Sequence, residues 1–329
     1  MKFLVIGLGS MGKRRIRNLL ALGYSDIAGF DVREDRRSEA YAKYNIVIFS
    51  DFDSALSGFN PDALIISVPP DLHMHYAYLG FHRRLSSFIE ASVVDAEEIR
   101  MLGYLMRDSE FIIVPSCTMR YSAGPRKIKE IIQSGQIGKI LNVNYHTGQY
   151  LPDWHPWENI EDYYVSKRET GGARELVPFE LTWLNDIFGT PTPISCYKTK
   201  LSDLAVEIDD IYHFLLQYDH EVLANITIEV ISRPTAVREM RVLGTKGEIA
   251  FSGESNIVRY IKLGMTDWEE FKLNSGTREV GYINPEEPYI AEIKDFIAAI
   301  TAKDESLFPN SLIADYNILQ TLYSLEKLA

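Results

Sequence analysis

Residues 3–12 read Phe3-Leu4-Val5-Ile6-Gly7-Leu8-Gly9-Ser10-Met11-Gly12, an apolar run followed at once by three spaced glycines. The apolar run predicts a short buried strand, and residues 13–20 predict a helix with an apolar inner face. At such a strand-to-helix turn, Gly7 permits the tight bend, Gly9 lets a pyrophosphate approach the backbone, and Gly12 lets the helix pack closely. The N–H groups at the start of the helix favour an anion. The stretch therefore predicts a dinucleotide-binding turn.

An acidic residue stands where the next strand is expected to end. Residues 27–30 predict that strand, and Asp31 follows it directly. A carboxylate at this position accepts hydrogen bonds from the adenosine ribose and repels a 2′-phosphate. We therefore expect NAD(H) as the cofactor. NADP(H) is the alternative, because Arg33 is close enough to pair with a 2′-phosphate.

Length and composition limit the class of protein. With 329 residues and roughly 100–200 residues per domain, two domains are expected. The net charge of −12 argues against nucleic acid as a partner. Four basic residues do cluster in residues 13–17, where phosphate proximity or solvation would explain them. The cysteines are Cys117 and Cys196 alone, which favours a reducing cytoplasm over a disulfide scaffold. We expect no membrane span, because no apolar run is long enough to cross a membrane, and no signal peptide, because the chain opens on a core strand.

The first part of the chain alternates strands and helices. Expected strands are residues 47–49, 63–68, 87–90 and 111–114, and residues 96–107 are an expected helix. This alternation is typical of a doubly wound parallel sheet. We expect a dinucleotide-binding Rossmann domain over residues 1–120.

The rest of the chain, residues 121–329, predicts an α+β domain for substrate binding and oligomerisation. Expected strands are residues 140–145, 194–200, 211–218, 222–230, 240–243 and 247–251, and expected helices are residues 127–133, 180–188, 289–301 and 312–328. Consecutive strands with tight turns imply an open, mainly antiparallel sheet. The two last helices are expected to be able to pack back on the first domain. We expect a homo-oligomer, dimer or tetramer, joined through the open sheet face, with Ile226, Ile228 and Val230 or their neighbours on it.

Several stretches together resemble one known family. They are the opening residues 7–15, the run 63–70 followed by His73, residues 131–140, Gly171-Gly172 before a helix ending in Phe188-Gly189, and the last helix with Asp315, Leu319 and Tyr323. In these stretches the chain resembles the glucose–fructose oxidoreductase / inositol dehydrogenase (Gfo/Idh/MocA) family over nearly its whole length. The resemblance implies a nicotinamide-binding Rossmann domain and redox chemistry at a hydroxyl of a sugar, cyclitol or nucleotide sugar.

The motif and the resemblance together give the expected cofactor-binding residues. They are Gly7, Gly9, Ser10, Met11, Gly12, Asp31, Arg33, Ser67, Pro69, His73 and Glu90.

The chain departs from the family pattern at the positions that move protons. Family members usually carry Glu-Lys-Pro at the end of the fifth strand, whereas this chain has Glu90-Ala91-Ser92. The family's aspartate falls near Glu175, and its histidine falls on Phe179. Hydride transfer from an alcohol needs a base for the hydroxyl proton, and neither alanine nor phenylalanine supplies one.

Residues 148–180 contain the candidates to replace the missing groups. The expected catalytic residues are Lys167, His155 and Glu175, in that order. His155 lies between Trp154 and Trp157 in the sequence. Its imidazole can titrate near neutrality and act as a base, or it is a structural partner of the two rings. The expected substrate-binding residues are Arg120, Tyr150, Trp154, Tyr163, Arg174 and Phe179. Arg174 is alternatively a structural ion pair at a helix start, and Glu180 is a base or a helix cap. No cluster has metal-ligand spacing, so no metal is expected.

These observations predict a cytoplasmic NAD(H)-dependent oxidoreductase acting on a hydroxyl or keto group of a sugar or nucleotide sugar. The alternative is a dinucleotide-binding sensor or scaffold of the same fold that has lost turnover.

Overall fold

The computed structural model describes all 329 residues and divides the chain into two compact units. The first unit comprises Met1–Thr118 and Glu286–Asn317, and the second comprises Met119–Pro285 and Ile318–Ala329. The stretch expected as one second domain is therefore interrupted, because residues 286–317 group with the first unit.

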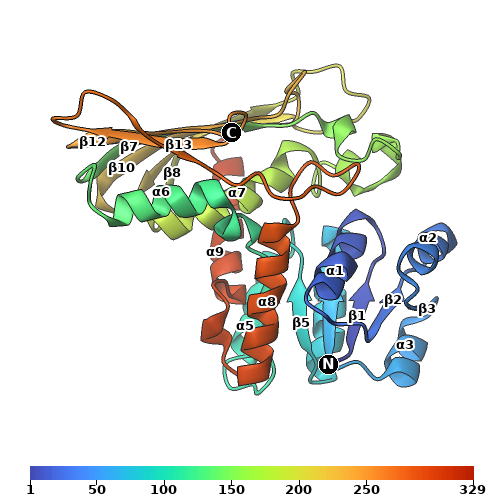
Figure 1. Cartoon of the computed structure of the whole chain (residues 1–329). Coiled ribbons are helices and arrows are strands. Elements are labelled where there is room, and N and C mark those ends of the chain that lie inside the picture. The colour runs from blue at the N-terminus through green and yellow to red at the C-terminus, as the bar shows by residue number, and fades with distance from the viewer. The chain divides into compact units, whose positions relative to one another are not determined.

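The first unit is built on a six-stranded parallel sheet (Figure 1). The strands are β1 (Phe3–Ile6), β2 (Ile27–Phe30), β3 (Val47–Phe49), β4 (Ala63–Ile66), β5 (Ser86–Ile89) and β6 (Ile113–Pro115). The helices are α1 (Ser10–Ala21), α2 (Glu34–Tyr44), α3 (Phe52–Phe59), α4 (His73–His82), α5 (Ala96–Leu105) and α8 (Glu287–Ala302). The sheet order is β3-β2-β1-β4-β5-β6, and every residue of β1 is buried. The order reverses between β1 and β4, which is the switch point where such sheets bind ligands.

The second unit contains an eight-stranded sheet in the order β14-β13-β12-β11-β7-β10-β9-β8. Its strands are β7 (Ile140–Gly148), β8 (Thr192–Thr199), β9 (Ile211–Tyr218), β10 (Val222–Glu229), β11 (Val237–Gly244), β12 (Gly247–Ser252), β13 (Ile257–Lys262) and β14 (Glu269–Lys272). Its helices are α6 (Ala123–Gln133) and α7 (Gly172–Phe188), and α9 (Leu312–Glu326) begins in the first unit and ends in the second. All neighbouring strands are antiparallel except β7 and β10. The expected fold class, a Rossmann domain plus a mainly antiparallel α+β domain, is confirmed.

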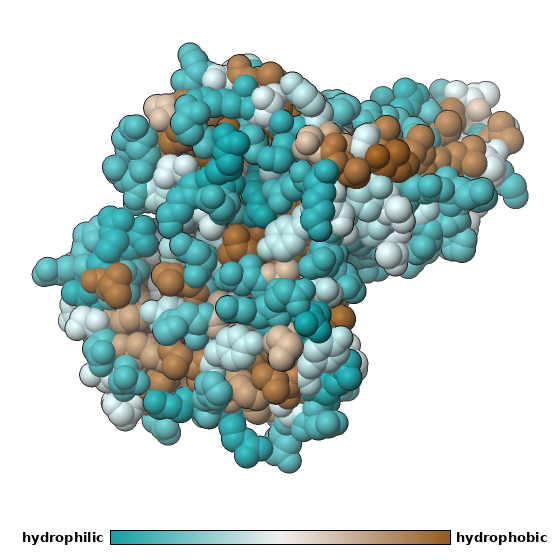
Figure 2. Space-filling model, turned by 180° about the vertical axis from the view of Figure 1, so that it is seen from behind, coloured by the Kyte–Doolittle hydropathy of each residue, from teal (hydrophilic) through white to brown (hydrophobic).

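One face of this sheet is covered by α6 and α7, and the other carries no helix (Figure 1). Of the two expected arrangements, the one with Ile226, Ile228 and Val230 on the open face is wrong, because all three are fully buried. The alternate residues Asn225 and Thr227 are partly exposed, since successive side chains of a strand point to opposite faces. Apolar atoms are nevertheless visible along this sheet in Figure 2, and Leu223 and Leu243 are among the exposed apolar side chains. The outer face is therefore of mixed polarity.

The helix that carries the candidate active-site residues is longer than the sequence predicted. The expectation was residues 180–188, whereas α7 begins at Gly172 and continues through an internal Pro178. Gly172 has φ +65°, and a Cβ there would lie 2.8 Å from the carbonyl oxygen of Asp209, so the helix start needs glycine. No helix of the chain combines the length and the apolarity needed to cross a membrane.

Candidate active site

The glycine turn has the backbone that the sequence predicted. Gly7 has φ +87°, and a Cβ there would lie 2.5 Å from the carbonyl oxygen of Ser67 on the loop after β4. A Cβ on Gly12 would overlap the carbonyl oxygen of Gly7, so only glycine lets α1 sit this close to β1. The N-cap of α1 is Gly9, and no side chain caps the helix. The start of α1 therefore presents backbone N–H groups to an anion.

Asp31 lies beside this turn at the end of β2. One carboxylate oxygen accepts the Leu8 backbone N–H at 2.7 Å, and the other accepts the Arg33 N–H at 2.9 Å. The Arg33 guanidinium pairs with Asp35, with Nη2 2.6 Å from the carboxylate. The alternative in which Arg33 holds a 2′-phosphate would therefore require that pair to break. This arrangement favours an unphosphorylated ribose next to Asp31.

His73 begins α4 after the loop that contains Ser67 and Pro69. Its ring is buried, and Nε2 lies 2.9 Å from the Val68 carbonyl oxygen, so Nε2 carries the proton. Burial lowers the pKa of the imidazole, which keeps the ring neutral. The other ring nitrogen, Nδ1, is buried without a hydrogen-bond partner. These groups fit a dinucleotide. The uncapped start of α1 suits the pyrophosphate, and Asp31 and the open acceptor Nδ1 of His73 suit hydroxyl groups.

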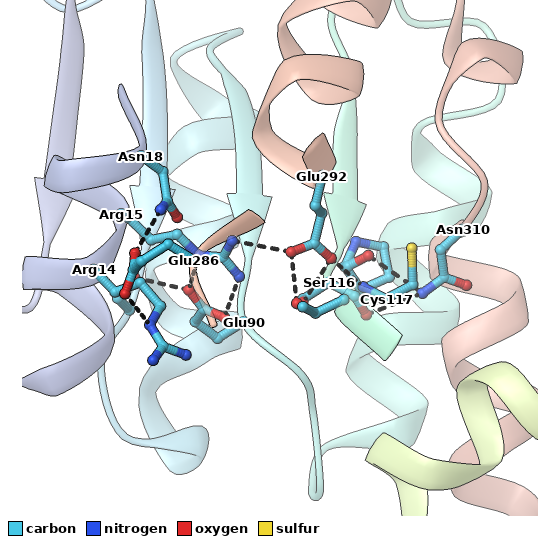
Figure 3. Close-up of polar contacts among 12 residues, drawn as sticks. Arg14, Arg15, Asn18, Glu90, Ser116, Cys117, Glu286, Glu292 and Asn310 are labelled. Atoms are coloured by element: carbon cyan, nitrogen blue, oxygen red, sulfur yellow. Dashed lines mark hydrogen bonds and ion pairs between the residues drawn. The ribbon is translucent and has the colours of Figure 1, made fainter. Parts of the chain in front are cut away.

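Glu90, at the end of β5, is engaged by Arg15 (Figure 3). The guanidinium donates to both carboxylate oxygens at 2.6 and 2.8 Å, and Ser67 Oγ donates to Oε1 at 3.2 Å. A second acid, Glu292 of α8, lies 3.0 Å from Nη1 of the same arginine. Two members of the basic cluster after the glycine turn therefore have partners within the protein. Arg15 is fully buried, and Arg14 pairs with Glu286, so neither solvation nor phosphate proximity explains them.

In the second unit, Glu175 lies in the first turn of α7. The Tyr164 hydroxyl donates to Oε1 at 2.7 Å, whereas Oε2 is buried without a partner. No lysine or arginine pairs with this carboxyl. Burial raises the pKa of Glu175 to about 8, and the Tyr164 hydrogen bond acts in the opposite direction. Glu175 is therefore a carboxylic acid that titrates near neutral pH.

Tyr163, whose ring interacts electrostatically with this carboxyl, belongs to a stack of aromatic rings. The His155 ring is stacked between Tyr163, at 4.7 Å between centroids, and Trp157, at 5.3 Å. Its Nδ1 lies 3.4 Å from the Glu158 carboxylate. The Tyr163 hydroxyl and the Trp154 Nε1 are both buried without a hydrogen-bond partner. The pKa of Tyr163 is raised by burial and by the charge of Glu175, which places the two groups within electrostatic reach.

Three other predicted residues lie apart from this cluster or have their own partners. Lys167 is exposed and directly follows the short 3-10 turn Tyr164–Ser166. Arg174 donates from Nε to Glu326 at 2.7 Å and also to the Glu169 carbonyl, so it has the structural ion pair that was the alternative. Arg120 donates to the Thr182 carbonyl at 2.9 Å.

The remaining predicted residues of this unit are Phe179 and Tyr150. Phe179 is half-buried, four residues after Glu175 on α7 and therefore on the same helix face. Tyr150 follows β7, and the Arg233 guanidinium lies 3.3 Å above its ring.

Glu180 is neither a free base nor a helix cap. It is fully buried, and Arg238 donates to both of its oxygens at 2.7 and 2.8 Å. Tyr145 and Trp183 donate to the same carboxylate. Sequence reasoning missed Tyr164 and Arg233, and no local signal links either residue to its partner. No group of three or more His, Cys, Asp or Glu side chains is arranged to hold a metal ion.

Comparison with known protein families identifies the chain. The model described as the oxidoreductase family with an NAD-binding Rossmann fold matches residues 1–109. The model of the GFO/IDH/MocA C-terminal domain matches residues 126–250. The chain therefore belongs to the Gfo/Idh/MocA family of NAD-binding oxidoreductases, and the expected family and cofactor are confirmed.

One curated relative and two solved structures show the range of similar proteins. The inositol 2-dehydrogenase of Salmonella paratyphi B is 23% identical over 158 residues, which is 46% of this chain. The match spans 47% of that relative, about half of its length. A levoglucosan dehydrogenase, in complex with NADH and levoglucosan, has a TM-score of 0.84 at 14% identity, covering 100% of this chain and 97% of its own. The UDP-N-acetylglucosamine 3-dehydrogenase of Acidithiobacillus ferrooxidans has a TM-score of 0.76 at 18% identity, covering 100% and 97%. The two structures show that the fold is shared.

Proposed function

We propose that the chain transfers hydride between a nicotinamide and a hydroxyl or keto group of a sugar or nucleotide sugar. Membership of an NAD-binding oxidoreductase family supports the redox chemistry, which the nicotinamide supplies when bound. The names of the similar proteins support the substrate class, since they are dehydrogenases of inositol, levoglucosan and a nucleotide sugar. The glycine turn, Asp31 and His73 would hold the cofactor.

The observation that carries this proposal is the buried carboxyl of Glu175. Its pKa of about 8 lets it hold or release a proton at working pH. As a carboxylate it accepts the proton of the reacting hydroxyl during oxidation, and as an acid it returns the proton during reduction. The unpartnered Tyr163 hydroxyl, whose pKa the charge of Glu175 raises, would hydrogen-bond the sugar beside it.

Glu175 replaces Lys167 as the leading candidate. Lys167 is an exposed residue, whereas burial raises the pKa of the Glu175 carboxyl to about 8 and no cation pairs with it. His155 lies within the ring stack and beside Glu158, which favours a positioning role for its ring.

The test is Glu175→Gln in the NAD-loaded protein, assayed on a panel of neutral sugars, inositols and nucleotide sugars. Removing a general base typically costs about 10²–10⁴-fold in rate, so turnover should fall by that factor while NAD affinity is kept. Wild-type oxidation should rise with pH through about 8, because the base is the ionised form. Glu169→Gln, which changes an exposed carboxylate on the same segment, is the matched control.

Wild-type turnover in Glu175→Gln would refute the role of Glu175. Tight NAD binding with no turnover over the whole panel would favour the alternative of a sensor or scaffold without catalysis. Ala91 and Phe179, which replace the family's lysine and histidine, are the residues that would account for that outcome.

We also propose that the chain works in the cytoplasm as a homo-oligomer. Neither Cys117 nor Cys196 forms a disulfide, and both are buried, which suits a reducing compartment. Exposed apolar side chains on the open sheet, such as Leu223 and Leu243, support self-association. A monomer mass by light scattering at micromolar concentration would contradict it.

A further inference from the structure

Arg233 of the second unit differs from Arg174 and Arg238 in having no carboxylate partner. Arg174 and Arg238 are each held by a carboxylate, at 2.7 Å in both cases. Arg233 is exposed and makes neither a hydrogen bond nor an ion pair. Its guanidinium carbon lies 3.3 Å from the centroid of the Tyr150 ring, so the group is stacked on that face. The result is a positioned cation without a counter-charge, in a chain whose net charge is −12.

Backbone hydrogen bonds connect this stack to the start of α7. Tyr150 pairs with Ile231 in a short antiparallel bridge, and the Leu151 N–H donates to Val230 at 3.0 Å. The Val230 N–H donates to Asp210 at 2.9 Å, and the Ala173 N–H donates to Asp209 at 3.1 Å. Ala173 lies two residues before Glu175 on α7. Arg233 and the candidate proton-transfer group are therefore carried by one hydrogen-bonded set of segments.

We propose that Arg233, held by Tyr150, binds an oxyanion of the substrate, either a phosphate or a carboxylate. This inference rests on the proposed function, because it assigns the anion to the substrate of that site. A planar guanidinium fixed by stacking keeps its N–H groups free for bidentate binding of such groups, and less entropy is lost when it binds. Nucleotide sugars and sugar phosphates supply the phosphate, and sugar acids supply the carboxylate. The substrate is then an anionic sugar, bound by its charge at Arg233 and by its reacting hydroxyl at Glu175.

The same unit contains a matched control. Arg259 also stacks on an aromatic ring, with its guanidinium carbon 4.8 Å from the Trp268 centroid. Unlike Arg233, it has an acidic neighbour, with Nη1 3.5 Å from the Glu270 carboxylate. Replacing either arginine removes one exposed, stacked positive charge, so only a specific anion site distinguishes the two variants.

The experiment is isothermal titration of the NAD-saturated protein with UDP, with D-glucuronate and with neutral D-glucose. Saturation with NAD keeps UDP out of the dinucleotide site. For the anion that binds, Arg233→Gln should weaken binding by about 10- to 100-fold, as expected for loss of a hydrogen-bonded charge. Arg233→Lys should recover part of that loss, and Tyr150→Leu should weaken binding less than Arg233→Gln does. Arg259→Gln should bind like the wild type.

The outcomes separate this inference from the hydride-transfer proposal. Binding of UDP but not of glucuronate assigns a phosphate, and the reverse assigns a carboxylate. If neither anion binds the wild type at millimolar concentration, or if Arg233→Gln and Arg259→Gln weaken binding equally, the anion site is refuted. If an anion binds through Arg233 while no sugar is turned over, the anion site stands and the hydride-transfer proposal fails.

Discussion

Two carboxyl sites, one in each unit, are surrounded differently. In the first unit, Arg15 is enclosed between Glu90 and Glu292, and Glu292 also accepts from Ser116 and Thr118 at 2.9 and 2.7 Å (Figure 3). In the second unit, Glu175 has a tyrosine hydroxyl and no cation. In the first arrangement the carboxylates are paired with a cation inside the protein. In the second, the carboxyl of Glu175 has no cation and can take up or release a proton.

The difference follows from the cost of burying a charge. An unpaired carboxylate removed from water costs several kcal/mol, which it avoids by taking up a proton. A guanidinium between two carboxylates meets that cost, and Glu90 and Glu292 raise the pKa of Arg15 against the lowering effect of its burial. We infer that the compensated cluster maintains the first unit and that the uncompensated carboxyl serves chemistry.

The largest expected effect is on stability in the first unit. Arg15→Met removes the only cation between Glu90 and Glu292 and should lower the free energy of unfolding by about 3–5 kcal/mol, as for breaking a buried pair. Denaturant unfolding measures the change. Arg33→Met removes an exposed pair with Asp35 and should cost less than about 1 kcal/mol. Equal losses of unfolding free energy in the two variants would refute the view that Arg15 compensates the buried charges of Glu90 and Glu292.

The second prediction concerns the pH dependence of stability. The folded-state pKa of Glu175, about 8, is above the ordinary value of 4.5, so the folded protein holds an extra proton between these values. Stability contributed by this group is present below pH 4.5 and is lost as pH rises through 8. Glu175→Gln removes the titration, so the melting temperature of the variant relative to wild type should increase by a few degrees from pH 5 to pH 9. A difference that stays constant with pH would contradict the shifted pKa.

Sequence reasoning succeeded where the signal is local. The turn at Gly7–Gly12 and the carboxylate of Asp31 lie within one strand–helix–strand unit, and short-range sterics fix their geometry. It failed where distant segments meet. Arg15 looked like part of a basic helix surface, because its partner Glu292 lies almost the whole chain away. Glu175 acquires its pKa from a burial that no spacing in the sequence displays.

The same limit explains the errors in the second unit. Alternation along β10 predicted two distinct faces, but which face α7 covers depends on tertiary packing. The sequence therefore left open whether Ile226 or its neighbours face outward, and Ile226 is buried. The start of α7 was placed eight residues late, since Pro178 lies inside the helix, where a proline lacks the N–H that a helical hydrogen bond needs.

The third prediction concerns Asp31, a carboxylate that has hydrogen bonds from the backbone but no close ion pair. Asp31 is buried, and two backbone N–H groups hold its oxygens. Asp31→Ala should weaken NADH binding by roughly tenfold, the value of one hydrogen bond to a charged group, and should affect NADPH much less. Fluorescence titration with both cofactors measures the gap. Tighter binding of NADPH by the wild type would refute the role of Asp31 in excluding the 2′-phosphate.

The smallest expected effect isolates the single hydrogen bond that Glu175 receives. The Tyr164 hydroxyl stabilises the carboxylate form, so Tyr164→Phe should raise the pKa of Glu175 beyond about 8. Because oxidation needs the ionised carboxyl, the rising part of the pH–rate profile should move to higher pH, while the plateau rate changes little. Tyr163→Phe is the control for the midpoint of the profile alone, since the Tyr163 hydroxyl makes no hydrogen bond to Glu175. Its plateau rate is not compared, because that hydroxyl is proposed to bind the sugar. If both variants shift the profile alike, ring packing rather than the Tyr164 hydrogen bond sets the pKa. If neither shifts it, the titrating group is not Glu175.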